Sequence, residues 1–387
     1  MSKENYINII DFGSSKIRFS VFDNKLNKIF FKSNSVSINE NFSNHFNIID
    51  ENIKKAEKEI SSHIKDIILT LDTKDLFTIN IALKKDLDVK TNIKKTYSNL
   101  LEELNRLISI HYSHYKILHI ILDKCFIDNK NYLELPKNIN KANNFKIEFK
   151  IICFKKNFLK FIETNFNKTN INVKNIFCTS YIKSLFYSNK IGISKNSFLD
   201  IGWERTTFII FENSKLKFIH SIPIGSFHIT KDISKILKIS VSDAEKIKKS
   251  FSQSDTEFSY KNKLNQENIK VSDIINKNIS IDLLKKVILF RVQEIIDLTF
   301  KSLQNNNRSF SLKETDLFLI GDGSLLFNNN SFHINDNFKF KSINFYDETD
   351  NQVCESALTY YINNYEIQRK TNKNLGIFEK FFNLFSK

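Results

Sequence analysis

The sequence of 387 residues is short of the residues that bend or crosslink a chain. It has seven glycines, two prolines and four cysteines, and no two cysteines form a CxxC pair. This spacing argues against a disulfide framework or a zinc site and favours a reducing compartment. No apolar run reaches the roughly 18 residues that a membrane span needs, and the polar N-terminus lacks the apolar stretch of a signal peptide. We therefore expect a cytoplasmic protein.

The composition is that of a globular protein, with 41% hydrophobic and 26% charged residues. Its length suits two lobes better than one compact core. The net charge of +15 raises the question of a polyanionic partner such as nucleic acid. However, the lysines are spread along the whole chain, and the richness in Lys, Asn, Ile and Phe is the codon bias of an AT-rich genome. We expect no nucleic-acid partner, because the charge forms no clustered footprint.

One strand–turn–strand pattern occurs twice. The first copy turns at Asp11-Phe12-Gly13 and the second at Asp200-Ile201-Gly202. In both copies the acidic residue is followed eleven positions later by a phenylalanine, Phe22 or Phe211, at the end of the second strand. This shared register indicates two related halves, each opening with a β-hairpin that carries Asp-x-Gly at its tip.

Other segments have simpler patterns. Asp50 is predicted to cap a helix whose apolar residues run from Ile53 to Ile67. Residues 79–154, between the two halves, combine a helical pattern with strand-like runs and indicate an inserted α+β piece. Residues 233–251 and 283–303 are predicted to form helices of the second half.

The two hairpin tips have the residue types that hold a nucleoside triphosphate with Mg²⁺. A glycine lets backbone N–H groups approach phosphate, hydroxyls add donors, and a carboxylate faces the metal through water. In the first half these residues are Asp11, Gly13, Ser14 and Ser15; in the second they are Asp200, Gly202, Thr206 and Thr207. The alternative is a pair of ordinary β-turns, in which Asp and Gly are common. The repeated register favours the phosphate site.

Two further segments are weaker candidates for a nucleotide site. Gly321 and Gly323, with Ser324 beside them, follow a short apolar strand at residues 316–320 and would let a nucleoside pack against bare backbone. Glu245 is placed to accept a hydrogen bond from a ribose hydroxyl, with Lys248 at i+3. The alternative for this pair is a solvated helix face that carries an ion pair.

The last thirteen residues, 375–387, follow a polar stretch at 363–374 and have the pattern of an amphipathic helix. Its apolar face consists of Ile377, Phe378, Phe381, Phe382, Leu384 and Phe385. The segment is too short to span a bilayer, but it suits the headgroup zone of a membrane surface. The alternative is a terminal helix that docks on its own protein.

These motifs together resemble the FtsA family of bacterial division proteins, which are relatives of actin and the Hsp70-type ATPases. The resemblance covers nearly the whole chain. It includes residues 11–16 and 200–211 as the two phosphate motifs, the former with Lys16, and a specific segment at residues 222–233. Residues 244–248, 291–294 and 320–323 also fit, and the tail resembles the family's membrane-targeting helix.

The resemblance implies an α/β fold of the actin-like (ribonuclease H-like) two-lobed ATPase type, with an inserted α+β subdomain and a C-terminal amphipathic helix. Lobe 1 would consist of residues 1–78 and 160–190, with subdomain 1C at 79–159. Lobe 2 would consist of 191–233 and 306–362, with subdomain 2B at 234–305. A linker at 363–374 and the membrane helix at 375–387 would follow.

The functional implication is a scaffold that binds ATP with Mg²⁺, assembles with itself into actin-like filaments and tethers FtsZ to the membrane. FtsZ would dock by its C-terminal tail on subdomain 2B, where Arg291 meets its acidic residues or forms a structural ion pair with Glu294. Asp11 and Asp200 would face the metal through water. The other partners would be anionic lipid and later division proteins, at the inner face of the cytoplasmic membrane. The alternatives are an ATPase or kinase of the same fold and a pilus-assembly adaptor related to FtsA.

The sequence departs from the family pattern in two places. Trp203, Glu204 and Arg205 stand where the second phosphate motif has further glycines, and Asp322 stands where the last motif has one. A Trp and a Glu there would crowd and repel phosphates, whereas Arg205 would offset the charge or replace metal contacts. At most a weak ATPase is expected.

Overall fold

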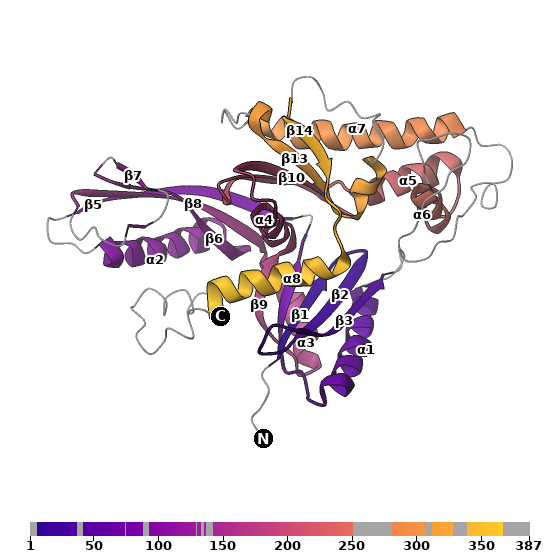
Figure 1. Ribbon diagram of the computed structural model, residues 1–387, viewed down its shortest axis with the longest axis horizontal. Coiled ribbons are helices and arrows are strands. Elements are labelled where there is room, and N and C mark those ends of the chain that lie inside the picture. Colours follow the sequence, from indigo (N-terminus) through magenta and orange to yellow (C-terminus); the bar gives the residue numbers. More distant parts are fainter. Residues whose placement is uncertain are drawn as a thin grey trace.

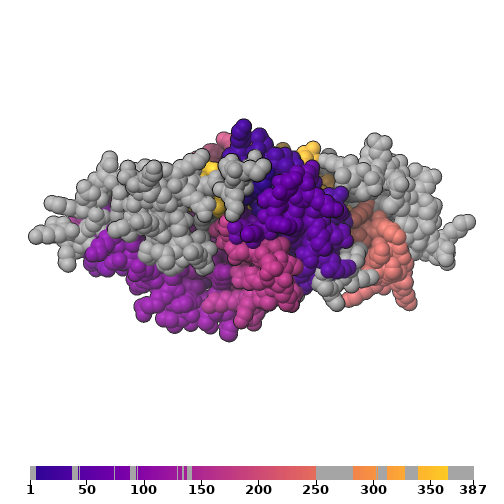
Figure 2. All heavy atoms as spheres, turned by 90° about the horizontal axis from the view of Figure 1, so that it is seen from below, coloured from indigo at the N-terminus to yellow at the C-terminus, as the bar shows by residue number. Residues whose placement is uncertain are grey.

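A computed structural model describes residues 6–36, 42–73, 75–87, 93–128, 130–132, 135–136, 142–250, 281–305, 312–327 and 339–366. The described strands form three sheets. In the view of Figure 1 two of them lie one above the other, and the third lies to one side. The view from below is long and flat, with lobe 1 in the middle of the visible face (Figure 2).

The sheet of lobe 1 has five strands in the order β3-β2-β1-β4-β9. Its strands are β1 (Ile7–Phe12), β2 (Lys16–Phe22), β3 (Lys28–Ser35), β4 (Asp66–Leu71) and β9 (Asn172–Cys178). The first three pair antiparallel, while β4 runs parallel to both β1 and β9. Both faces are covered by helices, so its central strands are almost continuously apolar and buried.

The sheet of lobe 2 repeats this topology in the order β12-β11-β10-β13-β14. Its strands are β10 (Lys195–Ile201), β11 (Thr206–Glu212), β12 (Lys215–Ile222), β13 (Asp316–Ile320) and β14 (Ser342–Phe345). Again three antiparallel strands are followed by two parallel ones. The predicted relation between the two halves is therefore confirmed strand by strand, and the hairpin tips after β1 and β10 are equivalent.

The third sheet has the order β5-β8-β6-β7 and is antiparallel throughout. Its strands are β5 (Phe77–Asp86), β6 (Tyr115–Ile127), β7 (Lys130–Tyr132) and β8 (Asn144–Lys155). Helix α2 (Ile93–His111) packs on it and gives it a hydrophobic cluster of its own. This unit falls largely within the residues assigned to subdomain 1C, and the domain boundaries themselves stay predictions.

The remaining helices cover the two main sheets or cross between them. They are α1 (Phe42–Ile60), α3 (Lys156–Lys168), α4 (Thr179–Ile191), α5 (Ser226–Leu237), α6 (Val241–Ser250), α7 (Ile281–Asn305) and α8 (Asp350–Tyr361). Helices α4 and α8 pack on each other, and between them they contact the sheets of both lobes (Figure 1). They bring lobe 1 and lobe 2 together around the two hairpin tips.

Two helix predictions need correction. Asp50 lies inside α1, which begins at Phe42, because Phe46 and Ile49 extend the buried face toward the N-terminus. Ile67 belongs to strand β4 and not to that helix. The single helix expected at 233–251 is two helices, α5 and α6, separated at Lys238, which has a left-handed φ of 53°.

Several predictions fall outside the described residues. They are the membrane helix at 375–387 with its six apolar residues, most of the linker at 363–374, and the middle of subdomain 2B at 251–280. Among the helices that the structure describes, none combines the length and the apolar character required to cross a bilayer.

Candidate nucleotide site

The first hairpin tip holds an ion pair between its acidic residue and a cation of the next strand. Asp11 and Arg18 are directly opposite each other in the register of β1 and β2. Arg18 Nη1 lies 2.8 Å from Asp11 Oδ2, and the hydroxyls of Thr70 and Thr179 donate to Oδ1 at 2.9 and 3.1 Å. Asp11 is 2% exposed, and both of its carboxylate oxygens bind donors of this chain.

Arg18 continues the pairing to helix α8. Its Nε and Nη2 atoms lie 2.9 and 2.8 Å from Asp350 Oδ1, at the first turn of the helix. Burial alone would raise the pKa of Asp350, but Arg18 and Lys16 outweigh this effect and lower it. Arg18 thus joins the carboxylates of β1 and α8.

The turn between β1 and β2 is too tight for a side chain at Gly13. A Cβ there would lie 2.5 Å from the carbonyl oxygen of Lys16. Ser14 is exposed at the tip, Ser15 is partly buried, and the Lys16 Nζ lies 3.0 Å from Asp322 Oδ2 of lobe 2. The structure therefore brings the first tip to the loop after β13, as the nucleotide hypothesis requires.

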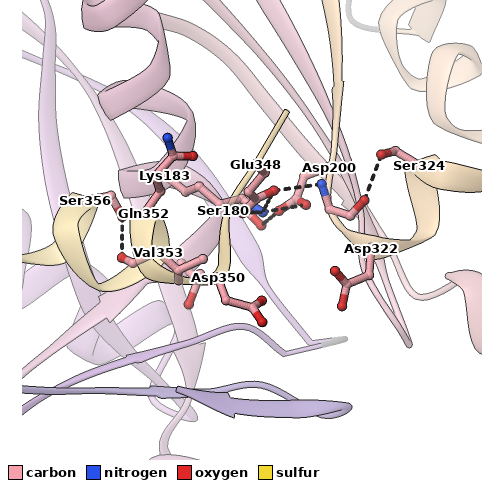
Figure 3. A network of polar contacts seen from close by, with 12 residues as sticks. Ser180, Lys183, Asp200, Asp322, Ser324, Glu348, Asp350, Gln352, Val353 and Ser356 are labelled. Atoms are coloured by element: carbon pink, nitrogen blue, oxygen red, sulfur yellow. Dashed lines mark hydrogen bonds and ion pairs between the residues drawn. The ribbon is translucent and has the colours of Figure 1, made fainter. Parts of the chain in front are cut away.

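The second tip has its own cation for its carboxylate. Lys183, on α4, places Nζ 3.0 Å from Asp200 Oδ1 and 3.1 Å from Glu348 Oε1, and Ser180 donates to Asp200 Oδ2 at 2.7 Å (Figure 3). Asp200 is 5% exposed. Burial would raise the pKa of Asp200, but Lys183 and Arg205 lower it overall. Both oxygens are bound within the protein.

Arg205 reaches across to lobe 1. Its guanidinium forms an ion pair with Asp72, just after β4, and donates to the hydroxyls of Ser180 and Thr207. Burial raises the pKa of Asp72, Arg205 opposes the shift, and the neighbouring charge of Asp200 adds to it. Both roles considered for Arg205, offsetting the charge of Glu204 and replacing metal contacts, stay predictions; the described ionic partner of Arg205 is Asp72.

The other hydroxyls assigned to the second phosphate motif are used inside lobe 2. Thr206 and Thr207 are fully buried. Thr206 donates to the carbonyl of Ile224 at 2.8 Å, and Thr207 Oγ1 lies 3.2 Å from Ser221 Oγ. Gly202 N donates to the carbonyl of Arg205 at 2.9 Å, which closes the tip. The phosphate-binding roles of Thr206, Thr207 and Gly202 stay predictions. A phosphate would have to replace the hydrogen bonds that these residues make within lobe 2.

Trp203 lies in a stack of rings and cations. Its ring packs on Phe227 at 4.8 Å between centroids, with the planes 19° apart. Lys231 lies over Phe227 at 4.5 Å, and Lys248 lies over Trp203 at 4.7 Å. Each ring therefore stacks on its neighbour and also lies near a cation, which stabilises the stack.

Glu245 and Lys248 form the ion pair of the alternative considered for them, but it is buried and not on a solvated helix face. Lys248 Nζ lies 2.6 Å from Glu245 Oε2 and donates to Thr230 Oγ1 and the carbonyl of Ser226, on α5. The Thr230 hydroxyl donates to the same carboxylate oxygen at 2.6 Å. Burial lowers the pKa of Lys248, against the attraction of Glu245. The pair fastens α6 to α5, and a ribose role stays a prediction.

The packing after β13 requires glycine at two positions. Gly321 has a φ of 84°, and a Cβ there would lie 2.6 Å from Asp200 Oδ1. A Cβ at Gly323 would lie 2.6 Å from Ile201 Cγ2. Gly321 N donates to Glu348 Oε2, and Ser324 Oγ donates to the carbonyl of Gly321 (Figure 3). The bare backbone here packs against the end of β10.

The arrangement does not fit a resident Mg²⁺ at Asp11 and Asp200. A metal held through water requires carboxylate oxygens that reach its hydration shell, but those of Asp11 and Asp200 are buried and hydrogen-bonded to Arg18, Lys183 and hydroxyls. Within the described part of the chain, no three His, Cys, Asp or Glu side chains gather as a metal ion needs. We therefore derive no step through a metal.

Several charged residues at this site were not found from the sequence: Arg18, Asp72, Lys183, Glu348 and Asp350. Arg18 lies seven positions after Asp11, and a hairpin register centred on the turn would have placed them face to face. Lys183 and Glu348 carry no such signal, because Lys183 reaches Asp200 from helix α4, and Glu348 pairs with Lys183 from a segment 165 positions further along the chain.

Arg291 lies apart from this site, on α7. Its Nε donates to Asp232 at 2.5 Å and its Nη1 to Glu294 at 2.6 Å. The structural ion pair with Glu294, one of the two roles considered, is therefore present. The partner-binding role stays a prediction.

The duplicated five-stranded sheets and the crossing helices define a two-lobed protein of the actin-like fold. Among solved structures, a PilM–PilN type IV pilus biogenesis complex resembles the chain with a TM-score of 0.58 and 12% identity, and the match covers 98% of each chain. At this identity the likeness shows the fold alone.

Sequence comparisons narrow the class. The family model of the cell division protein FtsA matches residues 198–342. The FtsA of Buchnera aphidicola subsp. Baizongia pistaciae is 26% identical over 308 residues, which cover 76% of this chain and 70% of the relative. The FtsA of Bacillus subtilis is 30% identical over 111 residues, 28% of this chain and 24% of the relative. The chain is thus similar to FtsA proteins in sequence and has an actin-like fold.

Proposed function

We propose that this chain acts in cell division as a scaffold that tethers FtsZ filaments to the inner face of the cytoplasmic membrane. The observation that carries the proposal is the similarity to FtsA over 76% of the chain. The pilus-adaptor alternative shares the fold, but the curated relatives are FtsA proteins. A kinase would need a free catalytic base, and the acidic residues of the interlobe site are bound to cations and hydroxyls.

Membrane contact is assigned to residues 375–387, whose apolar face carries four phenylalanines. A single short amphipathic helix binds lipid weakly and reversibly. Stable attachment therefore requires several copies presented together, which self-assembly into an actin-like filament would supply. Anionic lipid suits the net charge of +15. Further division proteins would be recruited to the same filament.

For the FtsZ tail we propose the outer face of α7, within the predicted subdomain 2B. Phe290 is 72% exposed and Leu283 45% exposed on this helix. Arg291 adjoins Phe290 and carries charge at the surface, although Asp232 and Glu294 already bind it. An exposed aromatic ring beside a cation suits a peptide with apolar and acidic residues.

ATP stays the ligand suggested by the fold, but the proposal requires no hydrolysis. The second phosphate motif carries Trp203, Glu204 and Arg205, and both tip carboxylates are neutralised by cations of the chain. An adaptor works by binding and assembly, so it does not require a metal-activated water. These features support an adaptor better than a catalyst.

The test is the binding of a fluorescent peptide with the sequence of an FtsZ C-terminal tail to the full chain, followed by anisotropy. We expect saturable binding that weakens about tenfold in Phe290→Ala, because an aromatic anchor at an interface contributes upwards of ~1.4 kcal/mol. Phe345→Ala is the matched control, since Phe345 is also exposed but lies on β14.

Absence of saturable binding to the wild-type chain would contradict the tethering proposal. Equal affinity of wild type and Phe290→Ala would move the docking site away from this face of α7.

A further inference from the structure

The charged side chains of the interlobe site pair with one another. Each of its acidic residues contacts a cation of the same chain, in most cases at hydrogen-bond distance. We call this set the interlobe charge cluster. Its cations are Lys16, Arg18, Lys183 and Arg205, and its acids are Asp11, Asp72, Asp200, Asp322, Glu348 and Asp350.

The charge of the cluster does not suit an added triphosphate. Six carboxylates against four cations leave two negative charges. A polyphosphate anion needs cations or N–H donors that it can bind without separating existing pairs. Here the cations are already held by carboxylates, and separating a buried pair leaves an uncompensated charge. Phosphate binding would therefore compete with the protein's own contacts.

Two ion pairs of the cluster join a hairpin of one lobe to a loop of the other. Lys16, after the first tip, lies 3.0 Å from Asp322 of lobe 2. Arg205, after the second tip, pairs with Asp72 of lobe 1. The first pair lies near the surface, because the Asp322 side chain is 51% exposed. The second pair is buried, because Arg205 is only 6% exposed. The two equivalent hairpins thus each bind the opposite lobe.

The remaining contacts of the cluster fasten the crossing helices to these hairpins. Arg18 joins Asp11 to Asp350 at the start of α8. Lys183 of α4 joins Asp200 to Glu348, which in turn accepts from Gly321 N (Figure 3). Both helices are therefore fixed at the positions where they pass between the sheets.

We infer that this chain holds its two lobes together with its own side-chain charges, in the place where a nucleotide and its metal would bridge them, so that closure requires neither. The inference concerns the state of the lobes and does not depend on FtsZ binding. It gives an adaptor whose interlobe geometry is constant, because no ligand cycle alters it.

The experiment measures the distance between the lobes by electron spin resonance in the full chain. The four native cysteines are buried. Spin labels at Lys55→Cys on α1 and Lys235→Cys on α5 therefore attach selectively, because both lysines are exposed. We expect the same distance and width in EDTA, in Mg²⁺ alone and in millimolar ATP with Mg²⁺. A distribution that becomes narrow or shifts only with ATP and Mg²⁺ would overturn the inference.

A second arm removes the bridging charges. Asp72→Asn with Asp322→Asn should broaden the distance, since both ion pairs between a hairpin and a loop of the opposite lobe are lost, while the pairs of Lys183 and Arg18 remain. Should this double variant fail to fold, Asp322→Asn alone at raised salt is sufficient, because Asp322 is an exposed residue. Glu314→Gln is the matched control, as its ion pair with Lys195 lies within lobe 2. Distances unchanged in the charge variants would also overturn the inference.

Discussion

At the scale of single residues, the interlobe site differs from a metal site because its carboxylates bind side chains of the same protein. Asp11 and Asp200 are in the equivalent positions that the repeated motif predicted, at the ends of β1 and β10. The motif could be found because Asp and Gly favour turns and alternating apolar residues favour strands, whatever the rest of the fold. The partners of these carboxylates could not be found in the same way, since Lys183 reaches Asp200 only through the tertiary fold, as Glu348 reaches Lys183.

Trp203 illustrates the same limit. The sequence indicated that its indole would crowd a phosphate, and the structure gives the ring a different environment, between Phe227 and Lys248. A residue that breaks a motif is easily noticed in a sequence. The partner that accommodates it depends on packing, which local pattern does not encode.

His119 is the residue whose titration is expected to be visible in stability. It is 3% exposed, its Nε2 accepts from the backbone N–H of Cys178 at 2.9 Å, and its Nδ1 lies 2.9 Å from the Tyr360 hydroxyl. Burial lowers the pKa of His119 to about 3. The folded state thus binds fewer protons than the unfolded state between that value and ~6.5, so stability is lost as the pH falls through this window.

We expect the free energy of unfolding to fall by about 1.4 kcal/mol per pH unit below pH ~6.5 through this group. Urea unfolding at pH 7, 6 and 5 measures it. His119→Gln should flatten the slope, because an amide keeps a donor and an acceptor without titrating. His111→Gln, at an exposed position on α2, should leave the slope as in wild type. An unchanged slope in His119→Gln would show that His119 is not the group responsible.

At the scale of elements, the strong periodic signals identified the elements correctly and the boundaries less well. The strands of both hairpins, helix α2 and strand β13 lie where the sequence indicated. Helix α1 begins eight residues before Asp50, since an apolar face outweighs a favourable capping residue inside a helix. The break between α5 and α6 occurs at a lysine in the left-handed region, which sequence rules assign to glycine.

The attachment of α6 to α5 gives the prediction at this scale. Lys248→Met should destabilise the fold by about 3 kcal/mol, because it leaves Glu245 buried without its ion-pair partner. Thermal or urea unfolding measures the loss. Glu245→Leu together with Lys248→Met should recover most of it, since a matched apolar pair carries no desolvation cost.

Lys249→Met is the control for the α6 experiment. Lys249 approaches the same carboxylate at 3.7 Å but is 57% exposed, so its removal should change stability by less than about 0.5 kcal/mol. Equal effects at positions 248 and 249 would contradict the assignment of a buried attachment.

At the scale of the whole molecule, the described residues form two related lobes and a third sheet. Duplication was readable from the sequence because the hairpins repeat in register, and the sheet topology confirms it. The relative placement of lobes and third sheet rests on contacts between distant segments. One example is Lys217 of β12, which lies 3.8 Å from Asp123 of β6. No single segment carries that information.

The proposed function requires one chain to bind FtsZ and a membrane together. The most direct measurement is flotation of FtsZ filaments with vesicles that contain anionic lipid, in the presence of the full chain. We predict that FtsZ floats with the vesicles, and that deletion of residues 375–387 leaves both proteins in the dense fraction. FtsZ that remains in the dense fraction with the full chain, or flotation undiminished by the deletion, would contradict the claim.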